Sequence, residues 1–192
     1  MADRVARIVR CLLTSTRPSE DGKASTDVND ALETMLLLLD SKLSASRVHV
    51  VRNYHDNLPL VPGDSIEIQE LFGNLISNAC DAMPEGGYLR LTTTVENQSV
   101  VAEVSDTGTG ITEADMAKVF DPFFTTKETS GGIGLGLYVV KNIAQKHGGK
   151  VEVRSQSGQG TTFRVAFPAT DVYDQAHGKQ TERASSRDKV AV

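Results

Sequence analysis

The feature that most constrains this chain is a glycine-rich run that precedes an amphipathic helix, because three further motifs stand before it. The run is Gly131-Gly132-Ile133-Gly134-Leu135-Gly136-Leu137. The three upstream motifs are, in order, Asn74-Leu75-Ile76-Ser77-Asn78-Ala79, Asp106-Thr107-Gly108-Thr109-Gly110 and Asp121-Pro122-Phe123-Phe124-Thr125-Thr126-Lys127. Each motif alone is a weak signal, since a glycine run can be a turn and an asparagine pair can be a buried polar contact. Together, in this order, they supply the parts of one magnesium–nucleotide site.

Composition fits one globular domain with short additions. The chain has 192 residues, 39% of them hydrophobic and 23% charged, as is ordinary for a soluble protein. The net charge of −5 gives no electrostatic reason to expect nucleic acid as a partner. Cys11 and Cys80 form neither a metal-binding spacing nor a disulfide framework, which favours a reducing compartment. The longest apolar run, Met35 to Leu39, is too short to span a bilayer, and no signal peptide is recognisable. We therefore expect this chain to lie in the cytoplasm. The parent protein could still be anchored in a membrane.

The chain divides into four parts. Residues 1–18 are predicted to contain a helix that ends at Arg17-Pro18, and residues 19–25 a polar linker. The helix carries an apolar stripe of Val5, Ile8, Val9, Leu12 and Leu13. The globular domain is predicted over residues 26–168. Residues 169–192 lack apolar periodicity and are predicted to be a disordered tail.

Within the domain, helical and strand periodicities alternate. Helices are predicted from Asp27, as the N-cap, to Leu43, from Ile66 to Met83 and from Gly136 to His147. Strands are predicted around residues 48–52, 89–93, 100–104, 151–153 and 163–167, with a turn over Pro59–Pro62 and a hairpin loop near Asn97. Three helices on one face of a mixed sheet make an α+β two-layer sandwich.

The order of the four motifs resembles the N, G1, F and G2 boxes of the histidine kinase ATP-binding domain. That domain belongs to a superfamily with gyrase, the heat-shock 90 chaperones and MutL. The resemblance covers residues 2–168 and implies a Bergerat-type ATP-binding fold that holds Mg²⁺ and ATP. It also implies the role of each motif.

In the resembled family the second asparagine of the N box supplies an oxygen to Mg²⁺, and here it is Asn78. Asn74 lies one helical turn before it on the same face and is interpreted as its support. The aspartate of the G1 box, Asp106, is expected to accept from the exocyclic amine of adenine, with Gly108 and Gly110 allowing the base to approach the backbone. An aspartic protease also uses an Asp-Thr-Gly turn, but this chain has no second copy of it.

The segment from Ile111 to Gly131 resembles the family's lid, with Phe123 and Phe124 expected to anchor it on the core. Lys127 is equally compatible with a phosphate contact and with a solvated surface lysine. The glycine cradle is expected to bind the phosphates through Gly132, Gly134, Leu135, Gly136 and Leu137. It is not a P-loop, since the Gly-Lys-Ser/Thr sequence is missing. His147, at the end of the last helix, is expected to interact with the helix dipole and to have no catalytic role.

The residue one helical turn before Asn78 favours a kinase activity over ATP hydrolysis. The gyrase and chaperone ATPases carry a water-activating glutamate one turn before the magnesium asparagine, where this chain has Asn74. An amide cannot take a proton from water. Glu70, a further turn away, is a poorer candidate base, so the catalytic residue stays unassigned, with Glu70 and Asn74 as weak candidates. Asp81 stands where many of these kinases have a basic residue, which leaves that phosphate contact open.

The phosphoacceptor histidine is expected to lie outside this chain. None of His49, His55, His147 and His177 lies in a helix with an acidic residue after it, as the acceptor of a sensor kinase does. The opening helix resembles the second helix of the dimerisation hairpin, so the chain resembles half of that hairpin followed by the full catalytic domain. We therefore expect the γ-phosphoryl group to pass to the phosphoacceptor hairpin of the same kinase and then to a response regulator. The parent is expected to be a homodimer, and this chain to associate weakly or not at all.

Two other functions remain possible from the sequence. A stand-alone serine kinase of the anti-sigma-factor type shares these boxes, but the helix over residues 2–16 and the linker disfavour it. A non-catalytic nucleotide-dependent binding module is disfavoured by the intact Asn78, Asp106 and glycine cradle.

Overall fold

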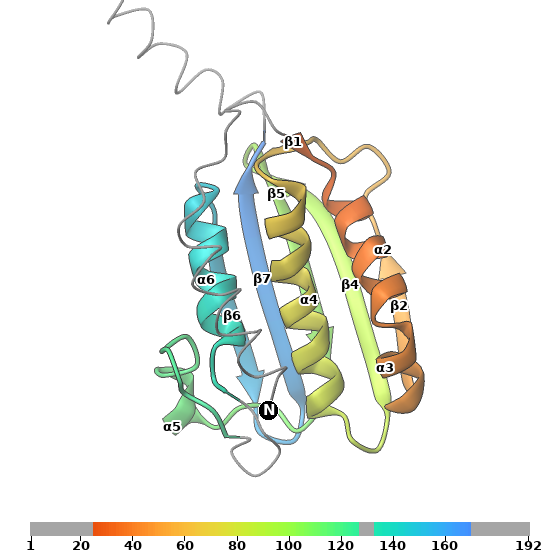
Figure 1. Ribbon diagram of the computed structural model, residues 1–192, viewed down its shortest axis with the longest axis vertical. Helices are drawn as coiled ribbons and strands as arrows, with labels where there is room; N and C mark the ends of the chain where they lie inside the picture. Colours follow the sequence, from red (N-terminus) through yellow and green to blue (C-terminus); the bar gives the residue numbers. More distant parts are fainter. Residues whose placement is uncertain (1–24, 127–132, 170–192) are drawn as a thin grey trace, which may run out of the picture.

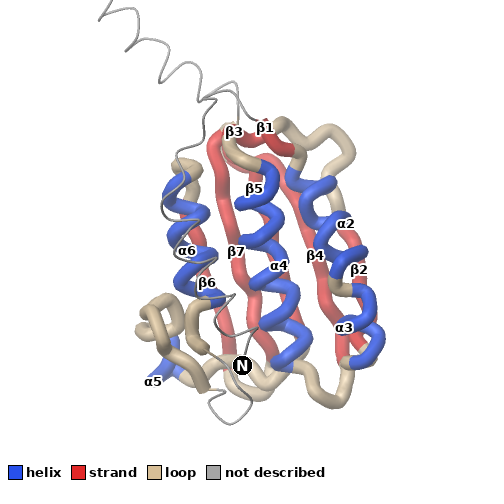
Figure 2. The backbone as a smooth tube through the Cα atoms, in the orientation of Figure 1, coloured by secondary structure: helices blue, strands red, loops and turns tan. Residues whose placement is uncertain are grey.

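A single mixed sheet carries a layer of helices on one face in the computed structural model, which describes residues 25–126 and 133–169. The sheet has five strands in the order β2-β4-β5-β7-β6, and α2, α4 and α6 lie side by side in front of it (Figures 1 and 2). The prediction of an α+β two-layer sandwich is confirmed. The elements are β1 (Ser25–Thr26), α2 (Val28–Leu38), α3 (Asp40–Ala45), β2 (Val48–Asn53), β3 (Val61–Pro62), α4 (Ser65–Ala82), β4 (Gly87–Glu96), β5 (Ser99–Asp106), α5 (Glu113–Met116), α6 (Gly136–Lys146), β6 (Lys150–Gln156) and β7 (Gly160–Pro168).

The sheet is mixed because β2 pairs with β4 in parallel, whereas the other three pairs are antiparallel. The β4–β5 hairpin turns at Asn97 and Gln98, both of which have positive φ (47° and 63°). This is the backbone that a two-residue hairpin needs to follow the twist of its strands. The pairing of β5 with β7 brings Asp106, the last residue of β5, opposite Thr161.

The core lies between the sheet and α4, the central helix. The apolar stripe predicted for this helix is buried from Ile68 to Ala79. Phe72 of α4 and Phe167 of β7 are among the largest side chains with almost no exposure. Burial of one full face stabilises α4 in this position, since packing of an amphipathic face supplies most of a helix's stability.

Two details differ from the prediction. The helix that begins at its N-cap Asp27 ends at Leu38 and restarts as α3, because Leu39 leaves the helical conformation (φ −100°, ψ 7°). In addition, Ser25 and Thr26 pair with Pro62 and Val61 as strands β1 and β3. The predicted linker therefore ends before Ser25, and the predicted turn over Pro59–Pro62 ends in a short strand.

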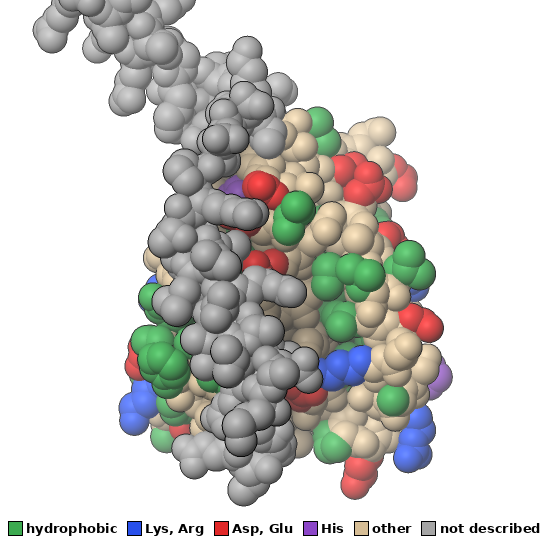
Figure 3. Space-filling view, viewed as in Figure 1, with side chains coloured by type: hydrophobic (Ala, Val, Ile, Leu, Met, Phe, Trp, Pro, Cys, Tyr) green, Lys and Arg blue, Asp and Glu red, His purple; other side chains and the backbone are tan. Residues whose placement is uncertain are grey.

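Apolar side chains gather on the outer surface of α2 (Figure 3), where Leu37 and Leu38 are exposed. No helix within residues 25–126 and 133–169 is long and apolar enough to cross a bilayer. The helix predicted before Arg17, the linker up to Ala24 and the tail after Ala169 lie outside the described residues.

Candidate nucleotide-binding site

The two asparagines of α4 face the beginning of α6. Asn74 donates its Nδ2 hydrogen to the carbonyl of Glu70 (2.9 Å), which fixes the amide on that side of the helix. A Cβ atom built on Gly136 would lie 3.4 Å from Oδ1 of Asn74 and 3.6 Å from Nδ2 of Asn78. A side chain at position 136 would therefore fill the space that separates the asparagines from the first turn of α6.

The first turn of α6 has backbone N–H groups that the side chain of its N-cap residue does not cap. Leu135, the N-cap residue, makes no side-chain capping bond, and the residue after it is Gly136. Gly134 has a φ of +72°, and a Cβ there would collide with the backbone of Phe123 and Phe124. Glycine is thus required at 134, and the start of α6 presents N–H groups to whatever anion lies before it.

Asp106 is held in place by the backbone around it. It is 6% exposed, and its Oδ1 accepts from the N–H groups of Gly108 (2.8 Å) and Thr161 (3.3 Å). A carboxylate has about four acceptor positions and can accept several hydrogen bonds at once. The orientation of this carboxylate is fixed by two strands, β5 and β7, and by the loop between Asp106 and Gly110.

That loop packs against the end of α4 and against the turn between β6 and β7. The N–H of Thr109 donates to the carbonyl of Ala82 at the end of α4 (3.0 Å), and its carbonyl accepts from Gly158 between β6 and β7 (2.7 Å). A Cβ on Gly108 would lie 2.5 Å from the Ala82 carbonyl oxygen, closer than real Cβ atoms approach. Gly108 is therefore needed for close packing against α4.

The phenylalanine motif follows the prediction only in part. Phe123 is 69% exposed, so the expectation that it anchors the loop on the core is wrong. Phe120 has that role instead, because its ring meets Phe163 of β7 edge-on with 6.5 Å between the centroids. Phe124 is half-buried. The N–H of Phe123 donates to the carbonyl of Gly134 (2.9 Å), which joins this motif to the glycine cradle.

Asp81 lies on the side of α4 that faces α3. Its carboxylate pairs with Nζ of Lys42 (2.6 Å), which also donates to Oγ of Ser77 (2.6 Å). The acidic residue at this position is therefore neutralised by a lysine from α3, a contact that the sequence did not indicate.

The structure places Asn74 and Asn78 beside Gly136, Phe123 beside Gly134, and the loop from Asp106 to Gly110 against the end of α4. Leu135 and Leu137 flank Gly136 at the start of α6. Lys127 and Gly132 lie outside the described residues. Sequence reasoning missed Thr161 and Phe120. The Gly158-Gln159-Gly160 turn before Thr161 and the apolar Val119 before Phe120 were the available signals.

The groups around Asn78 and the start of α6 fit a metal ion that is bound together with a polyphosphate. No group of three His, Cys, Asp or Glu side chains within the described part of the chain is arranged to hold a metal. An amide oxygen of Asn78 beside uncapped N–H groups suits Mg²⁺, which is usually bound through few protein ligands together with phosphate oxygens and waters.

Comparison with known proteins gives a consistent answer. A family model described as histidine kinase-, DNA gyrase B-, and HSP90-like ATPase matches residues 63–171. The chain is 33% identical to sensor histidine kinase ZraS of Escherichia coli (strain K12) over 167 residues, which are 87% of this chain and 36% of that protein. It is 35% identical to sensor kinase CckA of Brucella abortus (strain 2308) over 206 residues, covering 96% of this chain and 22% of that protein.

Among solved structures, the catalytic domain of the histidine kinase ThkA superposes with a TM-score of 0.68 at 26% identity. The match covers 76% of this chain and 95% of that domain. The chain therefore corresponds to a whole catalytic domain of this kind, but it spans only about a third or less of the two curated relatives.

Proposed function

The chain belongs to the family of histidine kinase-, DNA gyrase B- and HSP90-like ATPases, and we propose that it transfers the γ-phosphoryl group of ATP to a histidine within a sensor kinase. Membership of this family makes the domain an ATP-binding one. The observation that carries the transfer proposal is the residue one turn before Asn78. It is Asn74, whose amide donates to Glu70 and whose Oδ1 is directed at Gly136. An amide has no proton affinity comparable to a carboxylate, so Asn74 does not activate water.

Each part of the site has a task in holding the nucleotide. The buried carboxylate of Asp106 accepts a hydrogen bond from the exocyclic amine of adenine, and Gly108 and Gly110 keep side chains away from the ring. The N–H groups that follow Leu135 bind phosphate oxygens, with Lys127 as an additional cation. When bound, Mg²⁺ neutralises phosphate charge, and the oxygen of Asn78 is its protein ligand.

The transfer itself requires positioning more than acid–base chemistry. A neutral imidazole nitrogen already carries the lone pair that attacks phosphorus, so the domain needs no strong base. The γ-phosphoryl group leaves ADP and forms a P–N bond with the acceptor histidine. Holding the triphosphate in one orientation, through Asp106 at one end and the α6 N-terminus at the other, is the domain's contribution.

The acceptor and the later partner follow from the same proposal. The acceptor lies on a dimerisation hairpin, of which residues 1–18 would be part of the second helix, and residues 19–24 would link it to the domain. A response regulator would then receive the phosphoryl group in the cytoplasm. The two-fold hairpin makes the full kinase a homodimer.

The test is phosphoryl transfer in trans. The chain is incubated with γ-labelled ATP and Mg²⁺, with and without a separate hairpin from a sensor kinase that carries the acceptor histidine. We expect label on the hairpin that is lost in acid, because phosphohistidine is acid-labile. The Asp106→Asn chain serves as the control that should transfer little.

Two outcomes would overturn the proposal. Rapid release of labelled phosphate with no labelled protein would indicate a hydrolase. Acid-stable label on an added protein substrate would favour the serine-kinase alternative.

A further inference from the structure

A lysine from the short helix α3 reaches the face of α4 that carries the two site asparagines. Nζ of Lys42 lies 2.6 Å from Oδ1 of Asp81 and 2.6 Å from Oγ of Ser77, and it also donates to the carbonyl of Ser77 (3.2 Å). The side chains of Lys42 and Asp81 are 34% and 41% exposed, so a ligand from solvent can reach both. These contacts hold the ammonium group at one place on the surface of α4.

Asp81 lies on the same line along α4 as the asparagines. Asn74, Asn78 and Asp81 follow one another at spacings of four and three residues within this helix. Side chains at these spacings are neighbours on a helix surface, with about 5–6 Å between their Cβ atoms. The ammonium group of Lys42 therefore lies within about one helical turn of the Asn78 amide.

The start of α6 lies on the other side of this line. A Cβ on Gly136 would lie 3.4 Å from Oδ1 of Asn74 and 3.8 Å from Oδ1 of Asn78. Figure 1 shows α3 and α6 on opposite sides of α4. A polyphosphate held by the first turn of α6 and by Asn78 would therefore have Lys42 on its opposite side.

We propose that Lys42 is a phosphate-binding residue of the nucleotide site and that Asp81 positions it. The inference rests on the proposed function, because it takes Asn78 and the start of α6 as the place of the triphosphate. One Mg²⁺ does not neutralise all the charge of a triphosphate, and a lysine ammonium binds phosphate oxygens through charge-assisted hydrogen bonds.

The hydrogen bonds of Lys42 permit this contact. An ammonium group has three donors, and the longest of its three bonds here is the one to the carbonyl of Ser77 (3.2 Å). A carbonyl inside a helix also accepts from the N–H four residues later, so this one stays satisfied when the lysine leaves it. A phosphate oxygen can take that donor while Asp81 and the hydroxyl of Ser77 keep the other two.

The test is titration of Lys42→Met with Mg-ATP, measured by calorimetry. Methionine keeps much of the length of the side chain and removes its charge. We expect ATP affinity to fall about fivefold or more. Adenosine, which has no phosphate, should bind this variant as it binds the unmodified chain in an NMR titration, and this binding also shows that the variant is folded.

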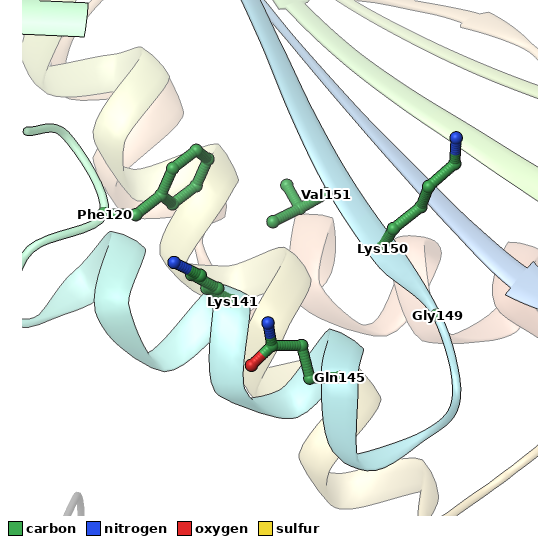
Figure 4. A pocket seen from close by; sticks show the side chains of 6 residues that line it. All are labelled: Phe120, Lys141, Gln145, Gly149, Lys150 and Val151. Atoms are coloured by element: carbon green, nitrogen blue, oxygen red, sulfur yellow. The ribbon is translucent and has the colours of Figure 1, made fainter. Parts of the chain in front are cut away.

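Lys150 provides the matched control. It is also paired with a carboxylate, since its Nζ bonds to Glu152 (2.8 Å). It stands at the beginning of β6, after the end of α6, and its side chain is directed away from the groove between these two elements (Figure 4). Lys150→Met should therefore leave the affinity for ATP and for adenosine unchanged.

A double variant separates a contact with phosphate from simple neutralisation of Asp81. Lys42→Met with Asp81→Asn removes the cation and the anion together, and we expect its ATP affinity to stay about fivefold below that of the unmodified chain. If the affinity returned to the unmodified value, Lys42 would act only by screening the carboxylate, and the proposal would be wrong. Unchanged affinity in Lys42→Met alone would also overturn it.

Binding and transfer are measured separately, so failure of this inference differs from failure of the proposed function. Loss of ATP affinity in Asn78→Ala, with none in Lys42→Met, would overturn the role of Lys42 and leave the proposed function in place. Absence of transfer to an added hairpin, with the effect of Lys42→Met on binding present, would count against the kinase proposal alone.

Discussion

Asn78 is the residue on which magnesium dependence rests in the proposed site. Its side chain is half-buried, makes no hydrogen bond within the described residues and faces Gly136, so it contributes little to the fold. We expect Asn78→Ala to weaken Mg-ATP binding about tenfold or more, which is about 1.4 kcal/mol, with the unfolding midpoint almost unchanged. Calorimetric titration with and without Mg²⁺ measures this, and Asn57→Ala, an exposed amide before β3, is the matched control. Equal affinity in the Asn78 variant would exclude it as the ligand.

In the proposed site, Asp106 is the residue that determines which base is accepted. Its Oδ1 holds two backbone N–H groups, and an asparagine at this position could keep both bonds through its own Oδ1. Asp106→Asn should therefore keep the conformation of the loop after β5. It replaces the second carboxylate oxygen by an NH₂ group, which is a donor and cannot accept a hydrogen bond from the adenine amine. We expect ATP affinity to fall by about 1–3 kcal/mol.

In the unmodified chain GTP should compete poorly with ATP, because its carbonyl would face a buried carboxylate. If GTP competed as well as ATP, the assignment of Asp106 would be wrong.

At the scale of elements, His147 joins the end of α6 to the beginning of α4. The N–H of Asp64, the N-cap of α4, donates to Nε2 of His147 (3.2 Å), so Nδ1 carries the proton and donates to the carbonyl of Ile143 (2.9 Å). The ring is 7% exposed and lies over Gly63. The expected contact of His147 with the end of its helix is present, and the link to α4 is an addition to it.

This link predicts a large cost for a small substitution. Gly63 has a φ of +145°, and a Cβ there would overlap the His147 ring. Gly63→Ala should therefore lower the free energy of unfolding by about 2–4 kcal/mol, from backbone strain and overpacking together. Gly158→Ala is the matched control, because Gly158 also has a positive φ (+75°) but nothing within 4 Å of its Cβ position. It should cost about 1 kcal/mol in urea unfolding. Equal costs for both would contradict the packing of His147 on Gly63.

The elements with strong periodicity could be predicted, and those that depend on distant partners could not. The helix over α4 follows from its apolar stripe and its terminators Pro84 and Gly86. The interruption at Leu39 could not be predicted, because Leu39 and Leu43 continue the apolar spacing across it. Strands β1 and β3 have two residues each and exist only through their pairing with one another.

The same distinction applies to the site. The order of the motifs predicts one shared location, and the structure places Asn78 beside Gly136 and the loop after Asp106 against the end of α4. These residues could be placed because each belongs to the end of a strong element. Phe123 was assigned to the core because it is aromatic, but its positive φ (+66°) turns the side chain outward and leaves Phe120 to pack on Phe163. Backbone conformation in a loop depends on tertiary contacts, here the bond to Gly134, which single-sequence patterns do not contain.

For the whole molecule, the one-sided helix layer leaves the other face of the sheet polar. Arg164 alternates with the buried Phe163 and Val165 and therefore lies on that face. It contacts the carboxylates of Glu96 (2.7 Å), Glu103 (3.7 Å) and Glu152 (3.7 Å). The nucleotide motifs, in contrast, all lie at one end of the helix layer, so an acceptor histidine must reach that end.

No histidine in the described part of the chain meets this requirement, which predicts that the chain binds ATP but barely labels itself. His147 is buried. His49 lies beside Tyr88, which is bonded to Thr107, but it alternates with the buried Val48 on β2 and therefore lies on the sheet face away from the helices. His55 follows β2, where its N–H is bonded to Thr93. With γ-labelled ATP alone, we expect acid-labile label to stay a small fraction of that on an added hairpin. The double variant His49→Gln, His55→Gln should leave transfer in trans unchanged. Acid-labile label mapped by mass spectrometry to a histidine of this chain would show that the acceptor lies within it.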